Sequence, residues 1–259
     1  MRNNDVDEFI ALTKSTRQLA REFLANNNGA LEYALNDFYD TCHGGFVTEI
    51  RPPAPKLNKL FDRYRSEKAD SICTDGLVRF VCDLGLQLED PVTLCMVHIM
   101  KCTGLHDSIS RDQFVHNWHD QMCNDLADIK DKLQEQESKL RTDSEYFETI
   151  YNYTYGLILE SDHKQLTVEV AAEYWKLFFD DSKGYRYAVQ PSNQLIELWS
   201  AYLLDQDVLR ISRDAWRMFF KFVRKYPTIQ AVKDNYNELD AWPLLIDEFY
   251  EHLDDLGLL

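Results

Sequence analysis

The chain has 259 residues, of which 45% are hydrophobic and 13% aromatic, so it can build a real core in one or two domains. Its 44 acidic and 28 basic residues give a formal net charge of −16, which argues against binding nucleic acid or an anionic membrane, because both need clustered cations. No apolar run approaches the ~20 residues that cross a bilayer.

Residues 5–43 predict a small bundle of three helices, because apolar residues recur at helical spacing in three short stretches. The Asn26 to Gly29 segment supplies a helix stop between the second and third stretches. Gly44-Gly45 and Pro52-Pro53 then break helical structure. The sequence therefore predicts a linker over residues 44–56.

Helical periodicity dominates the rest of the chain, residues 57–259. Ser212 is expected to cap one of these helices, and Thr142 with Glu145 three residues later resembles a capping box. Alternating β patterns are nearly absent, with residues 46–50 as a short candidate strand. We therefore predict an all-α fold in two domains, a small bundle and a larger helical domain.

The last twenty-six residues, 234–259, contain eight carboxylates and no Lys or Arg. An apolar stripe at helical spacing is formed by Ile246, Phe249, Tyr250 and Leu253. The neighbouring face is acidic and carries Asp247, Glu251 and Asp254. A helix anchored by the apolar stripe shows a negative surface to the solvent, which suits a basic partner.

Two groups of Cys and His have spacings that resemble zinc sites: Cys95, His98, Cys102 and His106, and then His116, His119 and Cys123. Ligands on one straight helix spread over ~16 Å, whereas tetrahedral zinc needs ligands that converge. The polar loop 65–75 resembles an EF-hand loop but lacks the glycine and glutamate that calcium loops need. We therefore expect no metal and no cofactor.

The chain has six cysteines: Cys42, Cys73, Cys82, Cys95, Cys102 and Cys123. A chain with its own core does not need disulfides, and the polar N-terminus does not resemble a secretory signal, so we expect reduced thiols in the cytoplasm and nucleus. No phosphate-binding glycine motif is present, and no base is marked beside a thiol. No catalytic residue is predicted, and a thiol-dependent transferase is a minor alternative.

Several long strings resemble the defective-in-cullin-neddylation family, above all its fungal members. They are Ala34 to Tyr39, Tyr174 to Phe179, Asp214-Ala-Trp216, Arg224 to Gln230 and Asp240 to Tyr250. The resemblance covers nearly the whole chain. It implies a ubiquitin-associated (UBA)-like bundle at 5–43 and an all-α potentiating-neddylation (PONY) domain at 57–259 with EF-hand-like helix pairs.

The resemblance implies a scaffold-type co-ligase, which is not an enzyme in its own right. Such a protein holds the C-terminal winged-helix domain of a cullin and the neddylation conjugating enzyme together, beside the RING ligase subunit, and promotes modifier transfer to a cullin lysine. Ubiquitin is a further expected partner, although Leu12 to Thr16 replaces the Met-Gly-Phe/Tyr loop of ubiquitin-binding members. The alternative is a helical ubiquitin- or calcium-binding adaptor without a transfer role.

The resemblance also implies two binding sites. The acidic cullin-binding patch of the family matches Asp214, Ala241 and Asp247, where carboxylates flank a small residue that lets a basic surface approach. A hydrophobic pocket takes the acetylated N-terminal Met of the conjugating enzyme, since a free ammonium would be costly to bury. Its expected wall residues are Leu77, Phe80, Met96, Ile109, Phe114, Tyr174 and Leu177. Each of these apolar residues could instead belong to the ordinary hydrophobic core, and for Phe80 and Phe114 the two interpretations are about equal.

Overall fold

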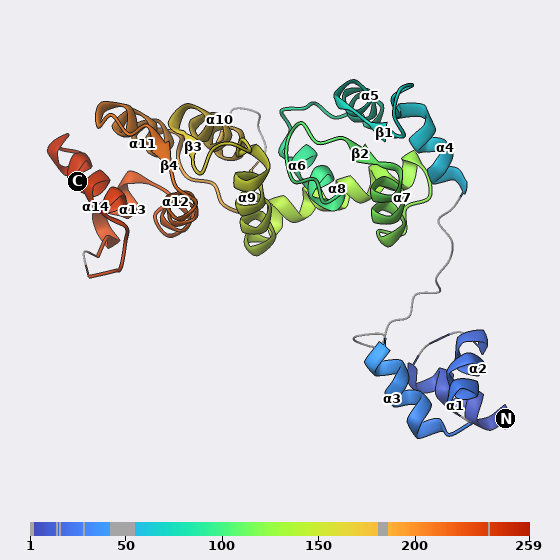
Figure 1. The fold of residues 1–259 in the computed structure, drawn as a ribbon. Coiled ribbons are helices and arrows are strands. Elements are labelled where there is room, and N and C mark those ends of the chain that lie inside the picture. Colours follow the sequence, from blue (N-terminus) through green and yellow to red (C-terminus); the bar gives the residue numbers. More distant parts are fainter. Residues whose placement is uncertain are drawn as a thin grey trace. The chain divides into compact units, whose positions relative to one another are not determined.

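A computed structural model gives the fold of the chain (Figure 1). It describes residues 3–13, 15, 17–27, 29–41, 55–180, 186–237 and 239–259. The chain divides into two compact units, residues 1–54 and residues 55–259. Within the described residues, no helix is long and apolar enough to cross a membrane.

The smaller unit is a three-helix bundle, as the apolar spacing predicted. Its helices are α1 (Asn3–Thr13), α2 (Arg17–Asn26) and α3 (Leu31–Thr41). Its buried core consists of Val6, Phe9, Ala20, Leu24, Ala34 and Phe38. Gly29 follows α2 with a φ of 78°, a left-handed conformation that glycine adopts without a steric penalty.

The candidate strand at 46–50 and most of the predicted linker lie outside the described residues. Residues 44–54 are not described, so the linker assignment there stays a prediction. Pro55 and Lys56 already belong to α4 (Pro55–Tyr64), which places the end of the predicted linker two residues too late. Proline at the first position of a helix lacks only an N–H that would have no partner there.

The larger unit is built almost entirely from helices, which confirms the predicted all-α class. After α4 these are α5 (Thr74–Leu84), α6 (Pro91–Ile99), α7 (Arg111–Asp120), α8 (Leu126–Thr142), α9 (Ser144–Ile158), α10 (Val168–Phe179), α11 (Asn193–Asp205), α12 (Arg213–Lys225), α13 (Ile229–Asn235) and α14 (Leu244–Asp255). The strands are β1 (Ser71–Ile72), β2 (Ile109–Ser110), β3 (Leu166–Thr167) and β4 (Arg210–Ile211).

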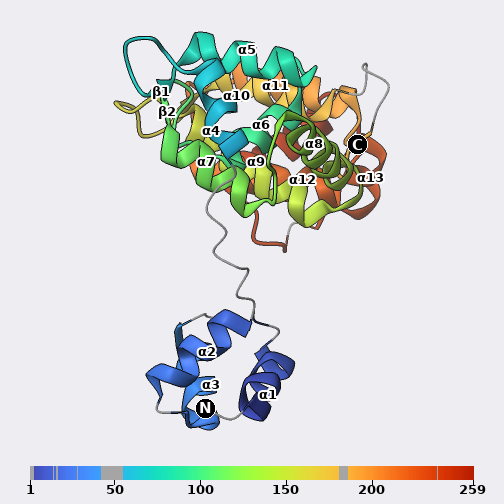
Figure 2. The ribbon, with the colours of Figure 1, turned by 90° about the vertical axis from the view of Figure 1, so that its right-hand side faces the viewer.

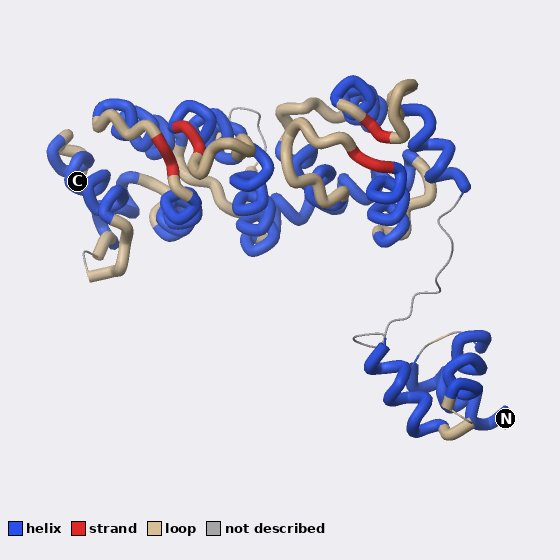
Figure 3. The backbone as a smooth tube through the Cα atoms, viewed as in Figure 1, coloured by secondary structure: helices blue, strands red, loops and turns tan. Residues whose placement is uncertain are grey.

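Two short antiparallel ladders join these helices into EF-hand-like pairs (Figures 2 and 3). Strand β1, between α4 and α5, pairs with β2, between α6 and α7, so that Ile72 lies opposite Ile109. Strand β3, between α9 and α10, pairs with β4, between α11 and α12, with Leu166 opposite Ile211. Helix α8 connects the first pair to the second (Figure 1).

Local capping agrees with the sequence at one of the two predicted helix starts and differs at the other. Ser212 caps α12 as predicted, because its hydroxyl accepts a hydrogen bond from the Ala215 N–H. Helix α9 is capped by Asp143, whose carboxylate accepts from the Glu145 and Tyr146 N–H groups. The capping box assigned to Thr142 is therefore wrong, since a carboxylate one residue later reaches the same free N–H groups.

Buried aromatic rings hold the second EF-hand-like pair together. The Trp216 ring stacks on the rings of Tyr151 and Trp175, with centroids 4.4 Å and 5.5 Å apart. The Tyr151 hydroxyl accepts from Trp175 Nε1 at 2.7 Å and donates to the Trp216 carbonyl at 3.0 Å. One hydroxyl thus satisfies two buried polar groups on α10 and α12, which fixes the positions of these helices against α9.

We expect Tyr151→Phe to lower the free energy of unfolding by about 1–3 kcal/mol, because it leaves the buried Trp175 indole N–H without a partner and removes the hydrogen bond to the Trp216 carbonyl. Denaturant unfolding of the full chain measures this loss. Tyr250→Phe is the matched control, since the Tyr250 hydroxyl has no hydrogen-bond partner among the described residues. Equal stability of the two variants would show that the Tyr151 hydroxyl does not bridge the helices.

The first EF-hand-like pair is closed by an arginine. Arg111, at the start of α7, donates to Asp62 Oδ1 at 2.6 Å, and to Asp70 Oδ1 and Oδ2 at 2.7 and 2.9 Å. Its guanidinium also lies 4.5 Å from the centroid of the Phe61 ring. The Arg111 hydrogen bonds hold the pKa of both aspartates below its ordinary value of 3.8. A side-chain cation thus cross-links α4 and the following loop to α7.

This link has a pH signature. Because the folded-state pKa of Asp62 and Asp70 is lowered, their stabilisation is complete above the unfolded value of 3.8 and is lost as the pH falls through the lower folded value. We expect Arg111→Met to lower the melting temperature at pH 7 and to have much less effect near pH 2. Arg79→Met, at an exposed position of α5, is the control. A pH-independent difference would contradict the ionic link.

Candidate functional site

The larger unit contains an apolar cavity of about 570 Å³ between its two EF-hand-like pairs. Helices α5, α6 and α10 form most of its wall, and the segments 88–89 and 102–107 complete it. This volume falls within the ~300–1,000 Å³ of small-molecule and peptide side-chain sites. The cavity is therefore large enough to enclose an apolar side chain together with the backbone that carries it.

Of the seven predicted wall residues, Leu77, Tyr174 and Leu177 line this cavity. The other four do not: Phe80, Met96, Ile109 and Phe114 are at most 1% exposed and belong to the hydrophobic core. The Phe80 and Phe114 rings contact each other with centroids 5.4 Å apart. The assignment of these four to the wall is corrected, because they point into the core of the first EF-hand-like pair.

The sequence prediction missed other wall residues. Those with apolar side chains are Val78, Leu88, Pro91, Leu94, Val97, Leu105, Leu157 and Tyr187. Leu88 and Leu105 keep 50% and 48% of their surface exposed, which is unusual for leucine and marks the mouth of the cavity. A loop without periodicity gives no sequence signal for such a position.

Hydrogen bonds hold the 102–107 segment against α9. The Leu105 N–H donates to the Leu157 carbonyl at 3.1 Å, and the Tyr153 hydroxyl donates to the Cys102 carbonyl at 2.6 Å. Asp107 Oδ2 accepts from the Thr103 hydroxyl at 2.6 Å, which lowers the pKa of Asp107. The cavity wall is thus supported before any ligand arrives, which reduces the entropy lost on binding.

The chemistry of the cavity suits an uncharged ligand. Its inner surface is apolar, and burial raises the pKa of the Cys102 thiol to about 11, so this thiol stays protonated at neutral pH. Burial likewise raises the pKa of the Tyr174 hydroxyl. The charged residues that contribute to the wall are Glu89, Asp107, Glu173, Lys176 and Asp180, all exposed or half-exposed. An ammonium inside the cavity would lose its water without gaining a buried counter-ion.

The predicted acidic patch lies elsewhere on the larger unit, on α12 and α14. Asp214 is exposed in the first turn of α12, where a carboxylate interacts favourably with the helix dipole. Ala241 is exposed in the segment before α14, and Asp247 is half-buried in the first turn of α14. Each of the three positions therefore presents at least part of its side chain to the solvent.

A ring of contacts positions the α14 part of this patch. The Tyr236 hydroxyl donates to Asp247 Oδ1, and the Tyr236 ring stacks on Tyr250 with centroids 4.0 Å apart. Burial and the nearby Asp247 carboxylate raise the pKa of Tyr236, so it remains a donor. Asp240 forms a 2.5 Å ion pair with Lys225 at the end of α12, which ties the segment before Ala241 to that helix.

The three predicted residues are spread along α12 and the α14 region rather than clustered at one point. Asp214 and Lys225 lie at opposite ends of α12, about 16 Å apart at 1.5 Å per residue. Because Asp240 pairs with Lys225, the adjacent Ala241 lies near the C-terminal end of α12, whereas Asp214 lies at its N-terminal end. A face of this length matches a protein surface better than a small molecule.

The tail of the chain forms the helix that its apolar stripe predicted. Ile246, Phe249 and Leu253 are at most 1% exposed, Tyr250 is half-buried, and Glu251 and Asp254 are exposed. Glu238, one of the eight carboxylates of the tail, lies outside the described residues.

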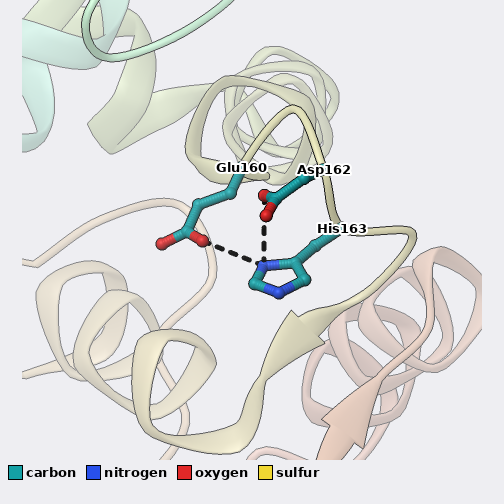
Figure 4. Close-up of side chains that lie close together, drawn as sticks. All are labelled: Glu160, Asp162 and His163. Atoms are coloured by element: carbon teal, nitrogen blue, oxygen red, sulfur yellow. Dashed lines mark ion pairs between the residues drawn. The ribbon is translucent and has the colours of Figure 1, made fainter.

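The Cys and His side chains with zinc-like spacing do not form a described ligand group. Cys95, Cys102 and Cys123 are buried, whereas His106 is exposed. Within the described ranges, the only group of three ligand atoms within 4.8 Å of one another is Glu160, Asp162 and His163 (Figure 4).

That group lies in the loop before β3, where His163 Nδ1 is 2.9 Å from Glu160 Oε2 and 3.8 Å from Asp162 Oδ1. The close approach of the imidazole to two carboxylates explains this arrangement without a metal ion.

Comparisons with known proteins agree with both units. The chain matches the UBA-like domain family over residues 3–43 and the cullin-binding domain family over residues 128–252. It is 38% identical over 256 residues to defective in cullin neddylation protein 1 of Saccharomyces cerevisiae, covering 96% of this chain and 93% of that protein. It is 40% identical over 246 residues to the protein of the same name from Eremothecium gossypii, covering 95% and 93%.

A more distant relative is DCN1-like protein 3 of Drosophila melanogaster, with 28% identity over 198 residues, 76% of this chain and 55% of that protein. The matches to the two fungal proteins cover 96% and 95% of this chain and therefore span both units. On this evidence the chain belongs to the defective in cullin neddylation protein 1 family.

Proposed function

We propose that this protein is a scaffold-type co-ligase for cullin neddylation. It binds the C-terminal winged-helix domain of a cullin through the face that contains Asp214, Ala241 and Asp247. It binds the acetylated N-terminus of the neddylation conjugating enzyme in the 570 Å³ cavity. The RING ligase subunit is a further member of the same assembly.

The observation that carries this proposal is the presence of two chemically different sites on one unit. The cavity is apolar and opens beside the exposed Leu88 and Leu105, whereas the second face is charged and extended. The family membership supports the same assignment, because relatives are named for cullin neddylation and a cullin-binding family model matches residues 128–252.

Such a protein accelerates transfer by positioning its partners. Holding the conjugating enzyme and the cullin together makes the attack of the cullin lysine on the thioester effectively intramolecular. The lysine nucleophile and the thioester belong to the two partners, so the scaffold needs no nucleophile or base of its own. Its five described cysteines are free thiols, and burial raises the pKa of Cys95, Cys102 and Cys123 to about 12, 11 and 11, which does not favour a thiolate.

A reconstituted neddylation reaction tests the proposal. With purified conjugating enzyme, cullin and RING subunit, addition of this protein should increase the initial rate of cullin modification. A variant in which all six cysteines are replaced by serine separates the scaffold from a thiol-dependent transferase and should retain the increase. No change in rate upon addition of the wild-type chain would refute the proposal.

Ubiquitin is a second proposed partner, through the UBA-like unit. Leu12 and Tyr39 keep 54% and 44% of their surface exposed at the ends of α1 and α3, and the Tyr39 hydroxyl donates to the Leu12 carbonyl at 3.1 Å. Leu12 itself belongs to the segment, residues 12–16, that replaces the family's usual ubiquitin-binding loop. Chemical-shift changes of Leu12 and Tyr39 on ubiquitin titration would support this contact; unchanged shifts would exclude it.

We also propose that the protein acts in the cytoplasm and nucleus. The free thiols Cys73 and Cys82 are exposed, which supports a reducing compartment.

A further inference from the structure

The exposed face of α12 is basic, although the chain carries a net charge of −16. Five of the thirteen residues of this helix are cations: Arg213, Arg217, Lys221, Arg224 and Lys225. At about 100° per residue, these five and Asp214 fall within an arc of about 120°. The buried residues of α12, such as Trp216 and Phe219, occupy the rest of the circumference. Asp214 therefore lies among cations.

Three of the five cations have partners within the protein. The Arg213 guanidinium lies 4.7 Å from the centroid of the Tyr155 ring. Arg224 pairs with Glu148 on α9 at 2.7 Å, and Lys225 pairs with Asp240 at 2.5 Å. These contacts fix α12 against its neighbours.

Arg217 and Lys221 differ from the other three. In the part of the chain that the structure describes, neither has an ion pair, a hydrogen bond or a ring contact. Arg217 is exposed and Lys221 is half-exposed. Two neighbouring cations, one turn apart, thus face the solvent without compensation on a strongly acidic protein.

The spacing links these two cations to the proposed cullin-binding face. Arg217 lies three residues after Asp214 and Lys221 seven residues after it, so all three lie within about 10 Å along the same side of α12. A protein that contacts Asp214 therefore also covers Arg217 and Lys221. Along this side of α12 one carboxylate is followed by two cations, and α14, which carries Asp247, packs on the same helix through Phe222 and Phe249.

A purely basic partner surface would meet repulsion at the middle of this face. Like charges placed opposite each other cost free energy, and complementary patterns select the correct partner and register. The partner must therefore present carboxylates between the cations that meet Asp214 and Asp247. Nucleic acid does not fit, because the acidic residues of α14 would repel its phosphates.

We propose that Arg217 and Lys221 bind an acidic segment of the cullin C-terminal domain that docks at Asp214 and Asp247. This inference rests on the proposed cullin-binding function and adds a specificity device to it. Arg217 and Lys221 select a partner surface that carries both signs of charge in the matching order, and they set its register along α12.

The test compares the affinity of the cullin winged-helix domain for four forms of the full chain by calorimetry: wild type, R217E/K221E, R217Q/K221Q and R79E/K130E. The last is a matched control, because Arg79 on α5 and Lys130 on α8 are exposed and its change in net charge equals that of R217E/K221E. Melting temperatures check that each variant is folded.

We expect R217E/K221E to weaken binding by about tenfold or more, R217Q/K221Q by about threefold, and R79E/K130E by less than twofold. Stronger binding by R217E/K221E than by the control would overturn the inference, because it would mean that the partner is basic at this point. Equal affinity of R217E/K221E and the control would also overturn it and leave the cullin site itself intact. Failure of the wild type to bind would refute the cullin site and this inference together.

Discussion

Replacing Asp247 with lysine is expected to abolish cullin binding and the rate increase in cullin modification. The half-buried Asp247 carboxylate is positioned by the Tyr236 hydroxyl, so the substitution places a cation where the proposed partner presents one. Reversal of a hydrogen-bonded interface charge costs several kcal/mol, which corresponds to at least about a hundredfold loss of affinity. Calorimetry with the winged-helix domain measures the loss directly.

Asp255→Lys is the matched control for this experiment. Asp255 is exposed at the end of α14, and its replacement by lysine changes the net charge by the same amount as Asp247→Lys. It should reduce affinity only slightly, through long-range electrostatics that weaken as salt is added. Both variants should still bind the acetylated peptide, because the cavity is formed by other helices. Comparable losses in the two variants would show that only overall charge matters and would refute a specific role for Asp247.

Acetylation of the conjugating enzyme's N-terminus is expected to strengthen its binding in the cavity by about a hundredfold. The inner wall is apolar, and the carboxylates of the wall are exposed or half-exposed, so an ammonium would be desolvated without a buried partner. Such a penalty reaches several kcal/mol, and each 1.4 kcal/mol corresponds to about tenfold in affinity. Acetylated and free N-terminal peptides of identical sequence, titrated into the full chain, give the comparison.

The substitution Leu177→Asp tests whether the acetylated peptide binds in the cavity. Leu177 is half-buried in the cavity wall, so a carboxylate there should remove most of the affinity for the acetylated peptide. Leu209→Asp is the control, since Leu209 is 76% exposed outside the cavity. Undiminished peptide binding by Leu177→Asp, or equal affinity of the two peptides, would place the peptide site elsewhere.

Helix periodicity was a reliable guide because it is local. The apolar stripe Ile246, Phe249 and Leu253 predicted α14, and Ser212 predicted the start of α12. The four strands could not be found this way, because each has two residues and therefore shows no alternation. Their pairing also joins segments far apart in the chain, such as Ile72 and Ile109.

The sequence was enough to predict the all-α class, the small bundle, the start of α12 and the similarity to a known family. All of these depend on spacing and residue type within short segments. It also pointed to three residues of the cavity wall, Leu77, Tyr174 and Leu177. It could not separate these from Phe80 and Phe114, because an apolar residue on a buried helix has the same pattern whether it faces a cavity or a core.

Wall residues can be told from core residues only in the folded protein, because the difference depends on which helices meet across the side chain. The tertiary structure also shows that Arg111 cross-links α4 and the following loop to α7, although Arg111 lies 41 residues after Asp70 and 49 residues after Asp62 in the sequence. Tertiary contacts also show that the acidic tail is not a uniformly negative surface. Lys225 pairs with Asp240, Tyr236 positions Asp247, and the basic helix α12 lies beside them. Charge counts along the sequence do not reveal such neighbours, because folding determines which charges share a face.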